Sequence, residues 1–127
     1  MQKKIKKWEE AFKIKGLDPK VLPDVSMLPD EYRKPVVAQF ILNVVADVLN
    51  DGWVADYTDS SQWKYHPYFL VKATKAKPSG SGLSYDVYVH WSTFTYCGVR
   101  LCYRDVETAE YAAKQFIKLY EDLYLKQ

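Results

Sequence analysis

Histidine and cysteine, the side chains that most often act in catalysis and metal binding, are few in this chain and stand apart. His66 and His90 are the only histidines, and neither has a Cys, Asp or Glu at the spacing of a metal site or a catalytic pair. Cys97 and Cys102 lie five residues apart, so an extended strand would point them to opposite faces. We expect two buried thiols and ordinary polar roles for the histidines, and we predict no enzymatic activity.

Four aspartates gather in one stretch that could be taken for a cation site. They are Asp47, Asp51, Asp56 and Asp59. A calcium loop needs a regular ladder of oxygen ligands that ends in a bidentate Glu, and this stretch lacks that ladder. Capping of backbone groups in a turn is the favoured role, and no metal is predicted.

The glycine- and serine-rich segment 79–82, with Lys75 and Lys77 beside it, invites comparison with phosphate-binding loops. Those loops lead from a strand into a helix whose N-terminus holds the phosphate. This segment instead joins two expected strands and contains neither GxGxxG nor GKS/T. A flexible hairpin loop is the favoured interpretation, and no cofactor is predicted.

Hydrophobic spacing predicts the elements that must position any binding residues. Helices are expected over residues 3–15 and 36–50, and a third follows Asp105 as N-cap, with apolar residues at helical spacing from Ala109 to Leu123. Alternation predicts strands over residues 68–74, 83–91 and 99–104. A proline-containing connector spans residues 17–29, and an ordered loop spans residues 53–67.

The predicted fold is therefore a single α+β domain over residues 1–127. A three-stranded antiparallel meander carries the helices on one face, and the elements follow the order α-α-β-β-β-α. Residues 1–28 supply the first helix and the connector, and residues 29–127 form the core.

Aromatic side chains point to the sheet as the functional surface. Four Trp, eleven Tyr and five Phe crowd mainly between Trp53 and Tyr103, and such rings suit either a core or an exposed surface. The inward side chains are expected to be Leu83, Tyr85, Val87, Val89 and Trp91. The outward set is then Lys72, Tyr88, His90, Arg100 and Arg104.

The residues that we expect to contact a partner combine rings and cations. They are Trp63, Tyr65, Tyr88, His90, Arg100 and Arg104, with Lys75 and Lys77 as mobile electrostatic contributors. Two classes stay open. A non-enzymatic protein-interaction or self-associating module is favoured, and the alternative is a protein that binds single-stranded nucleic acid by stacking, although Asp86 lies on the same face.

Composition narrows the classes further. A formal charge of +2 does not by itself argue for a polyanionic partner. No stretch approaches the roughly 20 apolar residues of a membrane span, and the first ten residues lack the apolar core of a signal peptide. We expect a cytoplasmic protein with no membrane partner.

Several segments together resemble a known group of proteins. The segments are residues 49–53, 63–69, 99–103 and 109–116. They resemble small uncharacterised proteins encoded by phages and integrated mobile elements of gut anaerobic bacteria, and the resemblance covers the chain from about Leu17 onward. It implies a bacterial cytoplasm in a phage or prophage context, and it offers no catalytic residues to carry over, because that family has no assigned activity.

Overall fold

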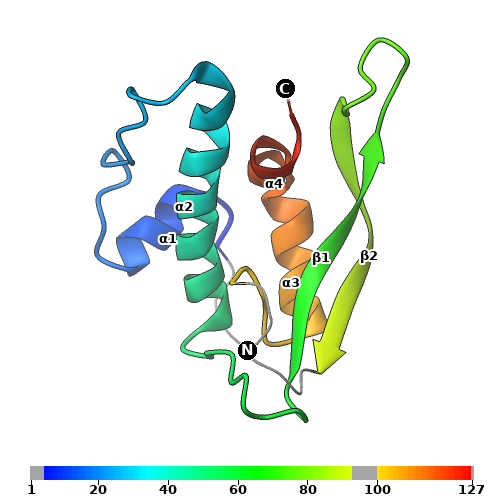
Figure 1. Ribbon diagram of the computed structural model, residues 1–127. Coiled ribbons are helices and arrows are strands. Elements are labelled where there is room, and N and C mark those ends of the chain that lie inside the picture. Colours follow the sequence, from blue (N-terminus) through cyan, green and yellow to red (C-terminus); the bar gives the residue numbers. More distant parts are fainter. Residues whose placement is uncertain (1–4, 93–99, 127) are drawn as a thin grey trace.

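Four helices and a two-stranded antiparallel sheet make up the described part of the chain, which confirms an α+β fold (Figure 1). The computed structural model describes residues 5–92 and 100–126, and the side chains of residues 86–92 lie outside that description. The elements follow the order α1 (Trp8–Ile14), α2 (Asp30–Asn50), β1 (Trp63–Lys72), β2 (Gly82–Ser92), α3 (Val106–Gln115) and α4 (Ile117–Tyr124).

The elements form layers. Helices α3 and α4 contact the sheet from one side, α2 packs on α4, and α1 packs on α2 (Figure 1). The N-terminal segment joins this assembly, since Phe12 is fully buried and its ring centroid lies 5.6 Å from that of Phe40. The hydroxyl of Tyr111 also donates to the Ile5 carbonyl. The described part of the N-terminal segment is thus in contact with the core through α1 and Ile5 before it.

Helix α2 is longer than its apolar periodicity predicts. It begins at Asp30, so Pro35 lies inside it and not in its first turn. It ends where Asp51 adopts a left-handed conformation, with φ of 49°, and the N–H of Asp51 donates to the Val48 carbonyl. Asp and Asn tolerate this conformation better than most residues. The predicted end of the helix at Asn50 is confirmed: Asp51 forms the cap, and Gly52 after it also has a positive φ, of 88°.

The first strand begins earlier than the sequence predicts. Residues 63–67 were expected in a loop, but they pair with β2, and Pro67 lies within the strand. A register shift occurs between Tyr68 and Phe69, which leaves Asp86 as an extra residue in β2. The prediction assumed that the side chains of β2 alternate without interruption between the two faces, and the register shift interrupts that alternation. The predicted directions of Val87, Val89 and Trp91 concern side chains outside the description.

The predicted three-stranded meander is not seen in the described residues. The segment expected as a third strand contributes one bridge, from Tyr103 to Tyr65 of β1, whereas a meander would place it beside β2. Proline explains why the pairing stops. The next hydrogen-bonded pair would join Pro67 to Leu101, and Pro67 has no N–H to donate. The N–H of Cys102 instead donates to the Arg100 carbonyl, at 2.9 Å, and the chain turns away.

The end of α2 holds this short segment in place. The Asn50 side chain is buried; its Nδ2 donates to the Cys102 carbonyl, at 2.9 Å, and its Oδ1 accepts from the Arg104 N–H, at 3.0 Å. In extended backbone, the N–H and C=O of Tyr103 point to one side, toward Tyr65, while those of Cys102 and Arg104 point to the other. The amide of Asn50 thus takes the place of a neighbouring strand.

The C-terminal region contains two helices where the sequence predicts one. Asp105 caps α3 as expected, because its carboxylate accepts from the Thr108 N–H at 2.7 Å. The helix is interrupted at Phe116, with φ of −115°, and α4 continues from Ile117. The apolar spacing continues across this break without Gly or Pro, so the pattern alone does not reveal it.

Candidate binding surface

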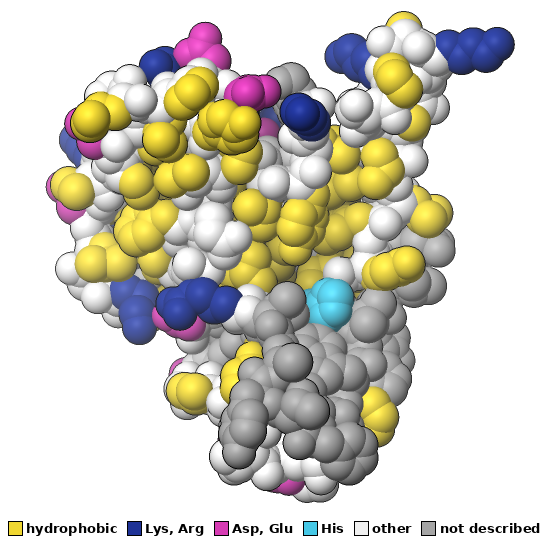
Figure 2. Space-filling model, viewed as in Figure 1, with side chains coloured by type: hydrophobic (Ala, Val, Ile, Leu, Met, Phe, Trp, Pro, Cys, Tyr) yellow, Lys and Arg dark blue, Asp and Glu magenta, His cyan; other side chains and the backbone are white. Residues whose placement is uncertain are grey.

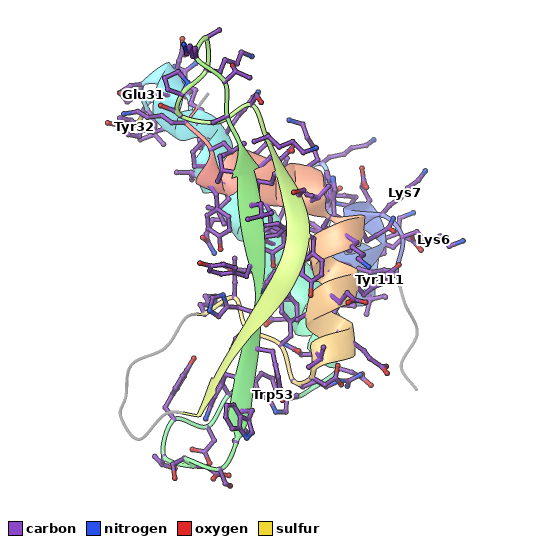
Figure 3. All side chains as sticks on the ribbon, turned by 90° about the vertical axis from the view of Figure 1, so that its right-hand side faces the viewer. Lys6, Lys7, Glu31, Tyr32, Trp53 and Tyr111 are labelled. Carbon is purple, nitrogen blue, oxygen red and sulfur yellow. The ribbon has the colours of Figure 1, made fainter. Side chains whose placement is uncertain are left out.

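The outer face of the β1–β2 hairpin is the side turned away from the helices. On β1, the Phe69 ring packs toward α4, with its centroid 5.0 Å from that of Tyr120. Successive side chains of a strand alternate between its faces. Tyr68, Leu70 and Lys72 therefore lie on the outer face, where Tyr68 is 52% and Leu70 51% exposed. Figure 3 looks onto this face, and no helix lies in front of it.

The far end of the hairpin projects beyond the helices and is positively charged. Lys72, Lys75 and Lys77 are exposed there, and the sequence from Trp63 to Tyr85 contains no Asp or Glu. Lys126 joins them, since it lines a hollow of about 350 Å³ together with residues 76–81. Figure 2 shows Lys or Arg side chains at the end of the projecting hairpin. This tip, defined as residues 72–81, attracts anionic groups at neutral pH.

The tip is fixed to the rest of the protein at its inner side. Gly80 has φ of 115°, and a side chain there would meet atoms of Leu125 and Val71 at 2.8 Å, so glycine permits this close approach. The Leu83 N–H donates to a carboxylate oxygen of Glu121, at 2.9 Å. The hairpin is thus presented in one orientation by the end of α4.

A buried lysine organises the opposite end of the hairpin, its base. The Lys64 side chain is fully buried, and its Nζ donates to the carbonyls of Asp56 and Asp59 at 2.7 and 3.1 Å. It also lies 5.5 Å from the centre of the Tyr57 ring. Hydrogen bonds from Thr58 and from Ser61 lower the pKa of Asp56 and Asp59, respectively, so both carboxylates are ionised at neutral pH. These aspartates shape the loop, as the sequence predicts.

A hollow of about 380 Å³ lies beside this base. It is lined by Asp47, Asn50, Trp53, Val54, Ala55, Tyr57, Arg100 and Cys102. Burial raises the pKa of the Cys102 thiol above its ordinary value of 9.0, so the thiol is protonated at neutral pH. A thiol is a much weaker nucleophile than a thiolate. Cys102 is a buried free thiol as predicted, and Cys97 lies outside the described residues.

The residues predicted for contact fall into two groups. Lys75 and Lys77 lie in the tip. Trp63, which is 45% exposed, starts β1 at the base, and Arg100 lines the hollow there. A ten-residue strand spans about 30 Å, so the structure does not bring the two groups together.

The other predicted residues differ in their surroundings. Tyr65 is half-buried against the core. Arg104 is held by the Asn50 carbonyl, at 3.2 Å, and by the Asp105 carboxylate, at 3.3 Å. Tyr88 and His90 pair with Pro67 and Tyr65 in the sheet, and their side chains lie outside the description.

Three exposed residues of the hairpin were not among those predicted for contact. They are Tyr68, Leu70 and Val71. The alternation of the expected strand already placed Tyr68 and Leu70 with Lys72 on one face, so the pattern could have identified them. The exposure of Val71, 54%, depends on how far the hairpin extends past the helices.

Within residues 5–92 and 100–126, no three His, Cys, Asp or Glu side chains gather where they could hold a metal ion. None of the helices in this part of the chain has both the length and the apolar character required to cross a bilayer. Comparison with protein-family models, with curated proteins and with solved structures finds no match in any of the three.

Proposed function

We propose that this protein is a non-enzymatic binding module that holds a partner protein on the outer face and tip of its β1–β2 hairpin. The observation that carries the proposal is a projecting hairpin whose outer face meets no described helix and exposes large apolar side chains. In the setting that the sequence resemblance implies, it would act as an accessory protein of a phage or mobile element.

The exposed residues favour a protein partner for a physical reason. Tyr68 and Leu70 are neighbours on the same face, and Val71 adds exposed apolar surface next to the tip. Each leaves about half of its surface in water, which costs free energy that a partner would recover. Grouped apolar side chains of this kind mark protein interaction sites more often than single ones do.

The hairpin also meets the requirement that a binding element be formed in advance. Phe69 fixes it against Tyr120, Glu121 holds the Leu83 N–H, and Lys64 fixes its base. A surface that is already ordered loses less conformational entropy when it binds.

Site-specific photo-crosslinking in cells that carry the gene tests the proposal. A photoreactive phenylalanine analogue replaces Tyr68 in one variant and Tyr32 in the other. Tyr32 is a matched control, because it is an exposed tyrosine on α2, at 54% against 52% for Tyr68. We expect a discrete crosslinked protein from position 68 and none from position 32.

A second substitution tests whether the face itself binds. Leu70→Ser should remove the crosslink at position 68, whereas Val36→Ser, at an exposed valine on α2, should leave it. Crosslinking of equal yield at positions 32 and 68 would contradict the proposal.

Single-stranded nucleic acid is a second candidate, favoured by one observation. Lysines from a stretch of sequence that contains no Asp or Glu lie on the same hairpin as the exposed rings of Tyr68 and Trp63. Stacking on such rings and contacts to phosphate are how many nucleic-acid binders work. Titration of the tryptophan fluorescence with a random oligonucleotide at two salt concentrations tests it. Quenching that weakens as salt rises would support this candidate, and an unchanged signal would exclude it.

A further inference from the structure

The backbone of β1 has an unused edge. On the side away from β2, the Tyr65 N–H donates to the Tyr103 carbonyl, at 3.1 Å, and the Tyr103 N–H donates back, at 2.6 Å. Backbone groups of alternate residues point to the same edge of a strand. Phe69 and Val71 therefore direct their N–H and C=O groups to the edge that Tyr65 uses.

Nothing in the described part of the chain pairs with this edge beyond Tyr65. The sheet has two strands, and the Tyr65–Tyr103 bridge stands outside them. Pro67 cannot donate, and the chain turns at Arg100, so the described segment that reaches Tyr65 leaves the edge there. An edge of this kind is a template for one more strand.

The charge around the edge selects what can occupy it. Lys72, Lys75, Lys77 and Lys126 lie at its far end, and the sequence from Trp63 to Tyr85 contains no Asp or Glu. The Glu121 carboxylate lies nearby, where it accepts from the Leu83 N–H. A second copy of this chain would bring the same positive hairpin. An acidic segment would instead gain attraction and faster association.

We propose that an extended segment of the partner protein, with acidic side chains at its N-terminal end, pairs antiparallel with β1 at Phe69 and Val71. This inference rests on the proposed function and specifies how the partner is bound. The direction follows from the geometry. A strand antiparallel to β1, as the segment at Tyr103 is, has its N-terminal end beside the lysines of the tip.

Nuclear magnetic resonance of the full chain with a defined probe tests the inference. The probe is a synthetic peptide with three N-terminal glutamates followed by alternating valine and threonine. Its control has the same composition with the glutamates at the C-terminal end. We expect amide exchange of Phe69 and Val71 to slow on addition of the probe, and the control to bind about tenfold more weakly.

Two variants at one position separate the backbone from the side chain. Val71→Pro removes the outward N–H and should raise the dissociation constant of the probe about tenfold, as expected for the loss of one hydrogen bond. Val71→Ala retains the N–H and should have a smaller effect. The spectrum of each variant reports whether the hairpin still forms.

Two results would overturn the inference. One is no change in the exchange of Phe69 and Val71 at millimolar probe, and the other is equal binding by the Pro and Ala variants. If either occurs while the crosslink at position 68 persists, the proposed function stands and only the edge pairing fails. Sedimentation in the same buffer detects pairing between copies, and a dimer that excludes the probe would count against a partner segment.

Discussion

The Asn50 side chain joins α2 to the segment that pairs with β1, and its removal has a predictable cost. Asn50→Ala deletes the hydrogen bond to the Cys102 carbonyl and the one from the Arg104 N–H. Asn50 is only 5% exposed, so water does not easily replace either bond. The variant therefore leaves two backbone groups unpaired.

The magnitude follows from those two groups. A buried polar group without a partner costs about 1 to 3 kcal/mol, and alanine returns a few tenths through its better helix propensity. We expect the free energy of unfolding to fall by about 2 to 5 kcal/mol, a large part of the roughly 5 to 15 kcal/mol of a typical domain.

Urea unfolding monitored by tryptophan fluorescence measures this change. Asn43→Ala is the matched control, because Asn43 lies on the same helix, is half-buried and bonds to the side chain of Gln39. We expect the control to change stability by less than about 0.5 kcal/mol. A loss of under about 0.5 kcal/mol in Asn50→Ala would refute the idea that its amide substitutes for a strand.

Three further outcomes follow from the hairpin and the cap of α3. Lys64→Met should loosen the loop that Lys64 holds, lower the free energy of unfolding by about 1 to 3 kcal/mol and expose residues 53–62 to protease. Lys72→Met, at an exposed position, is the control and should do neither. Equal cleavage of the two variants would contradict this. Burial raises the pKa of Asp105, but hydrogen bonds and the adjacent arginine outweigh it and lower the pKa below 3.8. The ionised Asp105 therefore contributes stability above pH 3.8, and this contribution is lost as the pH falls through the lower pKa of the folded state. In Asp105→Asn, the free energy of unfolding should fall less steeply in this acid range. Parallel pH dependences in the two proteins would refute this. In the free chain, amide exchange should be faster at Phe69 and Val71 than at Tyr68 and Leu70. Uniform exchange along β1 would show that its outer edge is covered.

The helices show what periodicity can and cannot predict. Helix α2 and the capping role of Asp105 follow from the apolar stripe and from the capping residue, which act within a few residues of chain. The break at Phe116 does not, because the same spacing of apolar residues serves one helix or two. Packing of Phe116 and Tyr120 in the core depends on distant segments.

The sheet was harder to predict because pairing is a property of two segments. Alternation identified the second half of β1 and nearly all of β2, but the pairing of Trp63 was hidden by Pro67, which usually indicates a loop. That proline is tolerated because its missing N–H faces the outer edge. The single bridge at Tyr103, in place of a full third strand, has the same cause.

The candidate site was predicted in part for a related reason. Lysines of the tip were identified from composition, and they do lie at one exposed end. Arg104 was predicted to contact a partner through its charge, but its guanidinium bonds to the backbone carbonyl of Asn50 and to the Asp105 carboxylate. Which cations remain available to a partner depends on tertiary contacts that the sequence does not display.

Amide hydrogen exchange of the full chain, with and without the protein crosslinked through position 68, tests the central claim most directly. The account predicts that protection on binding is confined to the β1–β2 hairpin, residues 63–92, and is strongest in β1 and the tip. Protection that falls on α1 and α2 while the hairpin exchanges unchanged would contradict it.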